Sequence, residues 1–189
     1  MNWDSHISYL NNKLRSQIFN FKAIKNLVDL KTRKAIYYAL VNSILSYGLE
    51  SYGNAILTNL VSLQELQVRV LKEIVPNRGK KALSNDNELF KKLDIMPLTQ
   101  LFAYKKIITN YKNDDLINKS LNVRGTRNEF YKQPITYNKY GTKTIKYQIN
   151  KYLNIISKKL KNINELTISN FKKDLKRFMM DDLETAKQN

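Results

Sequence analysis

The sequence contains no cysteine and one histidine, His6. Without thiols the chain can form neither a disulfide framework nor a thiolate metal site, which suits a reducing compartment. A catalytic histidine needs a nucleophile or a carboxylate within hydrogen-bond reach, and near His6 the sequence offers only Asp4 and Ser5, at the expected start of a helix. We therefore expect His6 to pack or to cap a helix.

Acidic residues are also few, with 16 Asp and Glu against 33 Lys and Arg. The acidic doublets are Asp114-Asp115, in a Lys- and Asn-rich turn, and Asp181-Asp182, near the C-terminus. Paired divalent ions need carboxylates that converge, and we interpret both doublets as solvated surface. No glycine-rich phosphate loop, nucleophile elbow or zinc-protease motif occurs. The sequence thus predicts no catalytic residue, no metal site and no cofactor.

Long apolar runs are missing as well. The longest uncharged run, residues 35–49, contains polar residues and is shorter than the ~20 residues that cross a bilayer. The polar start of the chain lacks the basic and apolar regions of a signal peptide. We expect no membrane span, no membrane partner and no secretion, and a nuclear or cytoplasmic location.

What the sequence does contain is helical periodicity in the spacing of its apolar residues. The expected stripes of residues 1–75 are Trp3, Ile7, Leu10, Leu14, Ile18 and Phe21; Ile36, Ala39/Leu40, Ser43/Ile44 and Tyr47; and Leu60, Leu63, Leu66, Val70, Leu71 and Ile74. Asp29 is placed to cap the second helix, and Pro76 to stop the third. We predict a mainly all-α chain that opens with a three-helix bundle over residues 1–75.

Further helices follow. Ser84, with acidic residues after it, is expected to cap a short helix ending near Leu93, and Pro97 to take the first position of the next one, in a second helical layer over residues 76–121. The period is lost over residues 122–142, which we interpret as an irregular basic arm. It returns in C-terminal helices over residues 143–180, the last of them capped by Thr167 or Ser169. Residues 181–189 are expected to form a disordered tail.

Positive charge is concentrated in the second half of the chain. Fourteen of the 33 Lys and Arg lie between Asn122 and Met180, beside three acidic residues, so this stretch contributes +11 of the formal net charge of +17. Such an excess indicates a polyanionic partner, nucleic acid above all. A genome rich in adenine and thymine could also raise lysine, as the 23 Asn suggest, but it would not concentrate the excess after residue 121.

Cationic and aromatic side chains alternate in that region, a mixture suited to phosphates and to unpaired bases without sequence readout. The candidate nucleic-acid-binding residues are Arg124, Arg127, Lys132, Lys139, Lys143, Lys146 and Lys151, as phosphate contacts, with Tyr137 and Tyr140 as stacking partners. Two alternatives remain open. The tyrosines could pack the arm while the lysines face water, and residues 143–161 could form a basic amphipathic helix on an anionic membrane, although packing explains their apolar stripe more economically.

The order of landmarks along nearly the whole chain resembles the region that follows the catalytic palm in reverse transcriptases of non-LTR, LINE-like retrotransposons. The landmarks are Trp3 with His6-Ile7 and Lys13-Leu14; Tyr47-Gly48 and Tyr52-Gly53; Leu63, Leu66-Gln67 and Val70-Leu71-Lys72; Leu93-Asp94-Ile95-Met96-Pro97-Leu98; Thr126-Arg127; and Phe171-Lys172-Lys173-Asp174-Leu175. Departures from the family pattern are Gly125, where Asn is usual, and Leu153-Asn154 with Ile156-Ser157, where a Trp-Asn and a Leu-Pro pair are common.

This resemblance implies that residues 1–75 correspond to the helical thumb, which grips the primer–template duplex through its backbone. The family's metal-binding aspartates lie upstream, so the isolated chain is expected to be a fragment that is not an enzyme by itself, with Mg²⁺ needed only by the missing palm. The expected partners are an RNA template or RNA–DNA hybrid and the palm and fingers of the polymerase. The alternatives are a free-standing basic nucleic-acid-binding adaptor and a helical protein-interaction scaffold whose charge is compositional.

Overall fold

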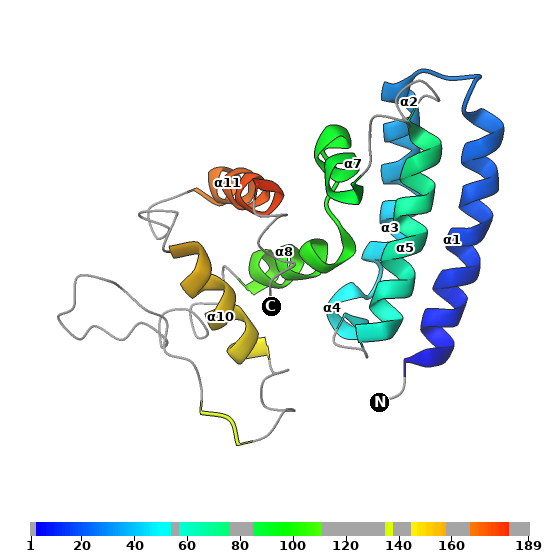
Figure 1. The fold of residues 1–189 in the computed structure, drawn as a ribbon. Helices are drawn as coiled ribbons and strands as arrows, with labels where there is room; N and C mark the ends of the chain where they lie inside the picture. The colour runs from blue at the N-terminus through cyan, green and yellow to red at the C-terminus, as the bar shows by residue number, and fades with distance from the viewer. Residues whose placement is uncertain are drawn as a thin grey trace. The chain divides into compact units, whose positions relative to one another are not determined.

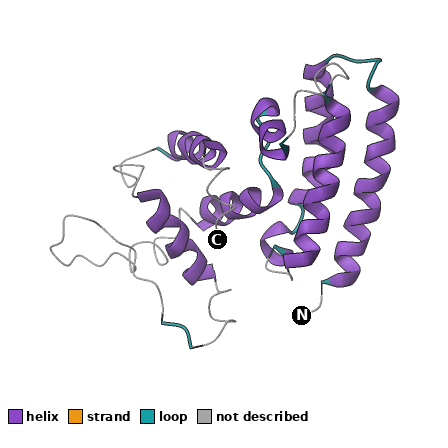
Figure 2. Ribbon diagram, in the orientation of Figure 1, coloured by secondary structure: helices purple, strands orange, loops and turns teal. Residues whose placement is uncertain are grey.

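The computed structural model describes residues 3–53, 57–75, 85–110, 135–137, 145–157 and 167–181. Within these ranges every regular element is a helix and no strand occurs (Figure 2). The predicted all-α class is therefore confirmed. The chain divides into two compact units, Met1–Phe102 and Ala103–Asn189. None of the described helices has the length and apolar character that a bilayer-spanning segment requires.

Unit 1 is built around two long helices, α1 (Asp4–Ile24) and α5 (Leu57–Ile74), which lie side by side (Figure 1). All six residues of the stripe predicted on α5 are buried. On α1 the buried residues are Ile7, Leu10, Leu14 and Phe21. Two members of the predicted α1 stripe, Trp3 and Ile18, are only half-buried. Ile18 therefore lies at the edge of the core, where a side chain can border both the interior and solvent.

Between these helices the chain forms α2 (Leu30–Ile36), a π-helix η1 (Tyr37–Asn42), α3 (Ser43–Ser46) and α4 (Leu49–Tyr52). Asp29 caps α2 as predicted, because its Oδ1 accepts a hydrogen bond from the Thr32 N–H at 3.2 Å. Gly48, in the left-handed region at φ 65°, separates α3 from α4.

The stripe predicted for this second segment is wrong. Its members Leu40 and Tyr47 are exposed, and the buried side chains are instead Tyr37, Val41, Leu45 and Leu49. These recur every four residues, which in a regular α-helix would rotate the stripe by about 40° per step. The wider turn of η1, with its i→i+5 hydrogen bonding, offsets this rotation and keeps Tyr37, Val41 and Leu45 on the side facing the core, whereas Leu49 lies in α4, after the break at Gly48.

One glutamine joins α5 to the turn before the last helix of unit 1. Gln67 is fully buried, and its Nε2 donates to the Tyr37 hydroxyl at 2.8 Å and to the Met96 carbonyl at 2.9 Å. Its Oε1 accepts from the Leu98 N–H at 3.0 Å. The side chain thus satisfies a buried hydroxyl and two backbone groups at once, which fixes the turn against the core.

Two helix starts in this region differ from the predictions by one residue. For α7 (Asp86–Leu93), the expected cap Ser84 lies outside the described residues, and Asn85 caps the helix by accepting from the Asn87 N–H at 3.2 Å. The helix α8 (Leu98–Asn110) begins one residue after Pro97, whose carbonyl accepts from the Leu101 N–H at 2.8 Å. Local hydrogen bonds, rather than the stripe, decide such boundaries.

Unit 2 has its own core, formed by α10 (Ile145–Ser157), α11 (Ile168–Asp181) and the part of α8 that follows Phe102. The core residues are Ala103, Ile107, Ile149, Leu153, Ile156, Phe171, Leu175 and Met179. Of the two predicted caps, Thr167 and Ser169, it is Thr167 that caps α11, and its Oγ1 lies 3.4 Å from the Asn170 nitrogen. On α10 the apolar residues Ile149, Leu153 and Ile156, which the membrane alternative would place on a bilayer, are buried in this core. The domain boundaries inferred from the sequence remain predictions.

Candidate functional site

The two long helices of unit 1 run parallel and are joined by a polar contact near each end. Asn11 donates to the Ser62 hydroxyl at 3.4 Å, and the Lys25 ammonium lies 3.3 Å from a carboxylate oxygen of Glu73. Asn11 precedes Lys25 on α1, and their partners Ser62 and Glu73 follow in the same order on α5. The two helices therefore run in the same direction. The Lys25–Glu73 pair is mostly shielded from solvent, with 9% and 17% of the two side chains exposed. These contacts hold α1 and α5 together at two points about four turns apart on α1 and three turns apart on α5.

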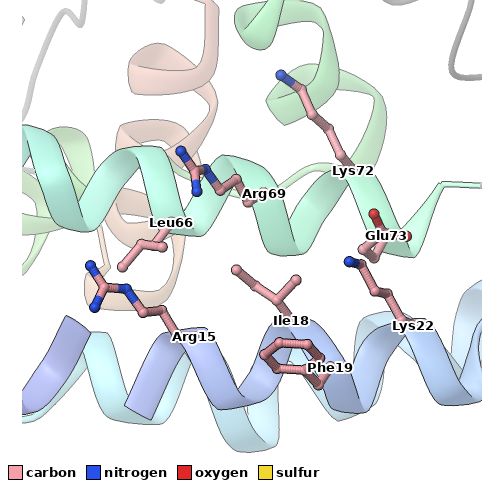
Figure 3. A pocket seen from close by; sticks show the side chains of 8 residues that line it. All are labelled: Arg15, Ile18, Phe19, Lys22, Leu66, Arg69, Lys72 and Glu73. Carbon is pink, nitrogen blue, oxygen red and sulfur yellow. The ribbon is translucent and has the colours of Figure 1, made fainter. Parts of the chain in front are cut away.

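A groove of about 410 Å³ runs between these contacts (Figure 3). Its lining residues are spaced i, i+3, i+4, i+7 on α1 and i, i+3, i+6, i+7 on α5, which places each set on one side of its helix. The lining residues are Arg15, Ile18, Phe19 and Lys22 from α1, and Leu66, Arg69, Lys72 and Glu73 from α5. Apolar side chains from both helices form its floor, and charged side chains form its rim.

The rim is strongly cationic. Arg15, Lys22, Arg69 and Lys72 are all exposed, and the carboxylate that shares the groove, Glu73, is paired with Lys25. In Figure 3, Arg15 extends from α1 toward α5, whereas Arg69 and Lys72 extend outward from α5. Within the described residues, neither Arg15 nor Arg69 lies in an ion pair. Two guanidinium groups are therefore available to an anion from solvent.

Lys72 has a partner, but an accessible one. Its ammonium lies 3.0 Å from a carboxylate oxygen of Asp86, and 52% and 54% of the two side chains are exposed. An ion pair in such a solvated position contributes at most about 1 kcal/mol and is screened by salt. A phosphate can therefore compete with Asp86 for this lysine.

The groove also presents an aromatic ring. Phe19 is 68% exposed, and the Lys22 ammonium lies 5.7 Å from its ring centroid, within the range of a cation–π contact. Arg15 precedes Phe19 by four residues and Lys22 follows it by three, so both cations share its side of the helix. The groove thus combines apolar, aromatic and cationic surface.

The buried tyrosines of unit 1 serve structure. Burial raises the pKa of the Tyr37 and Tyr52 phenols well above the ordinary 10.0, so both are neutral at physiological pH. The Tyr52 hydroxyl donates to the Leu45 carbonyl. His6 packs against aromatic rings, with centroids 5.9 Å from Trp3 and 5.3 Å from Tyr52. The expectation that His6 packs is confirmed.

Most of the site residues predicted from the sequence lie outside the described residues. These are Arg124, Arg127, Lys132, Lys139, Lys143 and Tyr140. Lys146 lies in the first turn of α10, and Lys151 is exposed farther along that helix. Tyr137 is 95% exposed, which leaves its ring accessible, whereas Tyr152 packs against the core of unit 2. Tyr152 therefore fits the packing interpretation, and stacking by Tyr137 stays a prediction.

The sequence alone does not predict the groove, although it contains one signal of it. Beside the apolar stripe of α1, polar and cationic residues recur at Asn11, Arg15, Lys22 and Lys25, with Ile18 among them. Such a stripe on one helix predicts only a solvated face. These cations form the rim of a groove only because α5 packs beside α1 in the same direction.

Potential metal ligands are dispersed across the described residues, where no group of three or more His, Asp or Glu side chains converges. Comparison of the chain with models of protein families, with curated proteins and with solved structures finds no match.

Proposed function

We propose that this chain holds nucleic acid by its phosphate backbone in the groove between α1 and α5, without reading base sequence. The observation that carries the proposal is the rim of exposed cations, Arg15, Lys22, Arg69 and Lys72, beside a carboxylate already paired with Lys25. Arginine presents a planar fork of donors that matches phosphate, and each contact releases condensed counterions.

In this proposal the chain is the thumb-like part of a non-LTR reverse transcriptase, and its ligand is an RNA template or an RNA–DNA hybrid. The ordered landmarks support this assignment, and residues 1–75, the proposed thumb, contain the groove. Phosphate contacts position a duplex without specifying sequence, as a polymerase that copies any template requires. In this proposal polymerisation and its Mg²⁺ belong to the palm of such an enzyme, and this chain binds the backbone of the template and primer.

The basic residues from Arg124 to Lys151 form a second set of phosphate contacts in this proposal. Lys151 and Tyr137 are exposed, as that role requires. The groove is the stronger candidate because its cations are held on two helices in a fixed register, whereas Lys151 stands on one helix.

The test is binding of a fluorescent RNA–DNA hybrid across a salt series. With four phosphate contacts, log affinity should fall against log salt with a slope of roughly −3 to −4. Changing Arg15→Glu together with Arg69→Glu should lower affinity by about tenfold or more and reduce the slope by about two. Both side chains are exposed, so the fold should persist, as circular dichroism would verify.

A matched control reverses the same number of charges outside the groove. Lys31→Glu with Lys92→Glu changes two exposed lysines that do not line it, so the salt slope should fall less. Equal losses from the two double variants would show that net charge alone determines binding. A wild-type affinity independent of salt would refute the phosphate role.

A further inference from the structure

Phe19 differs from the other exposed apolar side chains of α1 in its surroundings. A single exposed aromatic residue is ordinary on a protein surface. Here the ring lines a groove whose rim is cationic, and it lies between Arg15, four residues earlier, and Lys22, three residues later. An aromatic face flanked by phosphate-binding cations is the arrangement by which proteins hold unpaired nucleotides.

We infer that Phe19 is a stacking platform for an unpaired base, so that the groove prefers single-stranded nucleic acid or a single-stranded overhang to a continuous duplex. This inference rests on the proposed function and narrows its ligand. Inside a duplex both faces of each base are covered by neighbouring bases, and a ring on a helix surface cannot reach them. A base on Phe19 would bring its adjoining phosphates within reach of Arg15 and Lys22, which lie about 6 Å and 4.5 Å away along the helix axis.

The floor of the groove supports the same ligand. Ile18 and Leu66 line the same groove as the ring, so a base held there would bury apolar surface on more than one side chain. Lys22 lies over one face of the ring, so a base would stack on the other face or displace this ammonium, which stays within reach of the phosphates of that nucleotide. An acidic protein segment would satisfy the cations but would leave the ring without an aromatic partner.

The experiment measures binding of one labelled single-stranded oligonucleotide and of a blunt duplex of equal length. Phe19→Leu keeps an apolar side chain and removes the ring. We expect Phe19→Leu to weaken single-strand binding by about five- to a hundredfold and to leave duplex binding unchanged. Phe19→Trp keeps an aromatic ring and should bind the single strand about as tightly as wild type does. A 2-aminopurine base in the strand should be quenched by wild-type protein and less by Phe19→Leu.

Tyr9 provides a matched control on the same helix. Its ring is 53% exposed and carries Lys13 at 4.9 Å from the centroid, yet it does not line the groove. Tyr9→Leu should leave both affinities unchanged. A poly-glutamate peptide of equal charge should compete with the single strand poorly, because it cannot stack.

The outcomes separate this inference from the proposed function. The inference is overturned if the arginine variants weaken binding but Phe19→Leu lowers the affinities for single strand and duplex equally. It is equally overturned if Phe19→Leu changes neither affinity. It is also overturned when poly-glutamate competes as well as an unlabelled strand. If neither nucleic acid binds with a salt-dependent affinity, the proposed function itself is wrong.

Discussion

Unit 1 carries 14 Lys and Arg against 8 Asp and Glu, and unit 2 carries 19 against 8. The less basic unit nevertheless contains the groove with a cationic rim, because α1 and α5 hold that rim in register. In unit 2 the exposed cations of the described helices stand on α10 and α11 around an apolar core: Lys151, Lys172, Lys173 and Arg177. Charge density indicates a class of ligand, whereas paired helices determine where its phosphates can be held.

The largest expected effect is a loss of stability in unit 2 that leaves the stability of unit 1 unchanged. Phe171 is fully buried in the core of unit 2, so Phe171→Ala should lower the stability of that unit by about 3–5 kcal/mol. Hydrogen exchange should accelerate in α10 and α11. The single tryptophan, Trp3, lies in unit 1, so its fluorescence transition in urea should stay in place.

The same variant tests the groove. If the groove of unit 1 is the main binding site, Phe171→Ala should lower the salt-dependent affinity by much less than the Arg15 and Arg69 double variant does. Phe178→Ala, at the partly buried edge of the same core, is the matched control and should destabilise unit 2 less. A loss of affinity as large as that of the Arg15 and Arg69 double variant would mean that binding depends on unit 2, and the comparison would fail.

A somewhat smaller effect should be confined to unit 1. Gln67→Leu removes the partners of the Tyr37 hydroxyl, the Met96 carbonyl and the Leu98 N–H. Leaving buried polar groups unpaired costs about 1–3 kcal/mol each, so we expect a loss of about 3 kcal/mol in urea unfolding followed by Trp3 fluorescence. Hydrogen exchange in α10 and α11 should not change.

Gln64→Leu is the control for this prediction, since it makes the same substitution one turn away. Gln64 accepts from Thr99 at 3.4 Å and 3.3 Å, in contacts that solvent can replace. It should cost well under 1 kcal/mol. Equal losses for the two glutamines would show that the buried network of Gln67 contributes no more than a surface contact.

These polar links mark the boundary of what the sequence could predict. The stripes of α1 and α5 follow from periodicity alone, because each helix has one apolar face, and the Asp29 and Thr167 caps follow from local chemistry. Periodicity does not predict the buried hydrogen bonds of Gln67, because their partners Tyr37 and Leu98 are each about thirty residues away in the sequence. Only the packed structure brings those groups together.

The second helical segment shows a different limit. It carries apolar residues on two adjacent faces, and the predicted stripe lies on the face that contains Leu40 and Tyr47. The π-turn at Tyr37–Asn42 turns the other face inward, and a π-turn is rare enough that periodicity does not anticipate it. The groove was missed for a similar reason, because its rim needs the parallel pairing of helices some fifty residues apart.

The smallest expected effect concerns the start of α2. The Thr32 hydrogen bonds hold the pKa of the Asp29 carboxyl below its ordinary value of 3.8, so the folded chain binds this proton less tightly than the unfolded chain does. The cap therefore stabilises unit 1 fully above that value and loses its effect as pH falls through the lowered pKa.

Asp29→Asn keeps a capping side chain but cannot ionise, which isolates the charge. The stability difference between wild type and Asp29→Asn should be constant near neutral pH and should shrink as pH falls below about 3.8. Asp29→Ala should be less stable than either at neutral pH, because it removes the hydrogen bond as well. Urea unfolding at a series of pH values, followed by Trp3 fluorescence, would measure both differences. If wild type stayed more stable than Asp29→Asn by the same amount in strong acid, the ionised carboxylate of Asp29 would not be the cause of the difference.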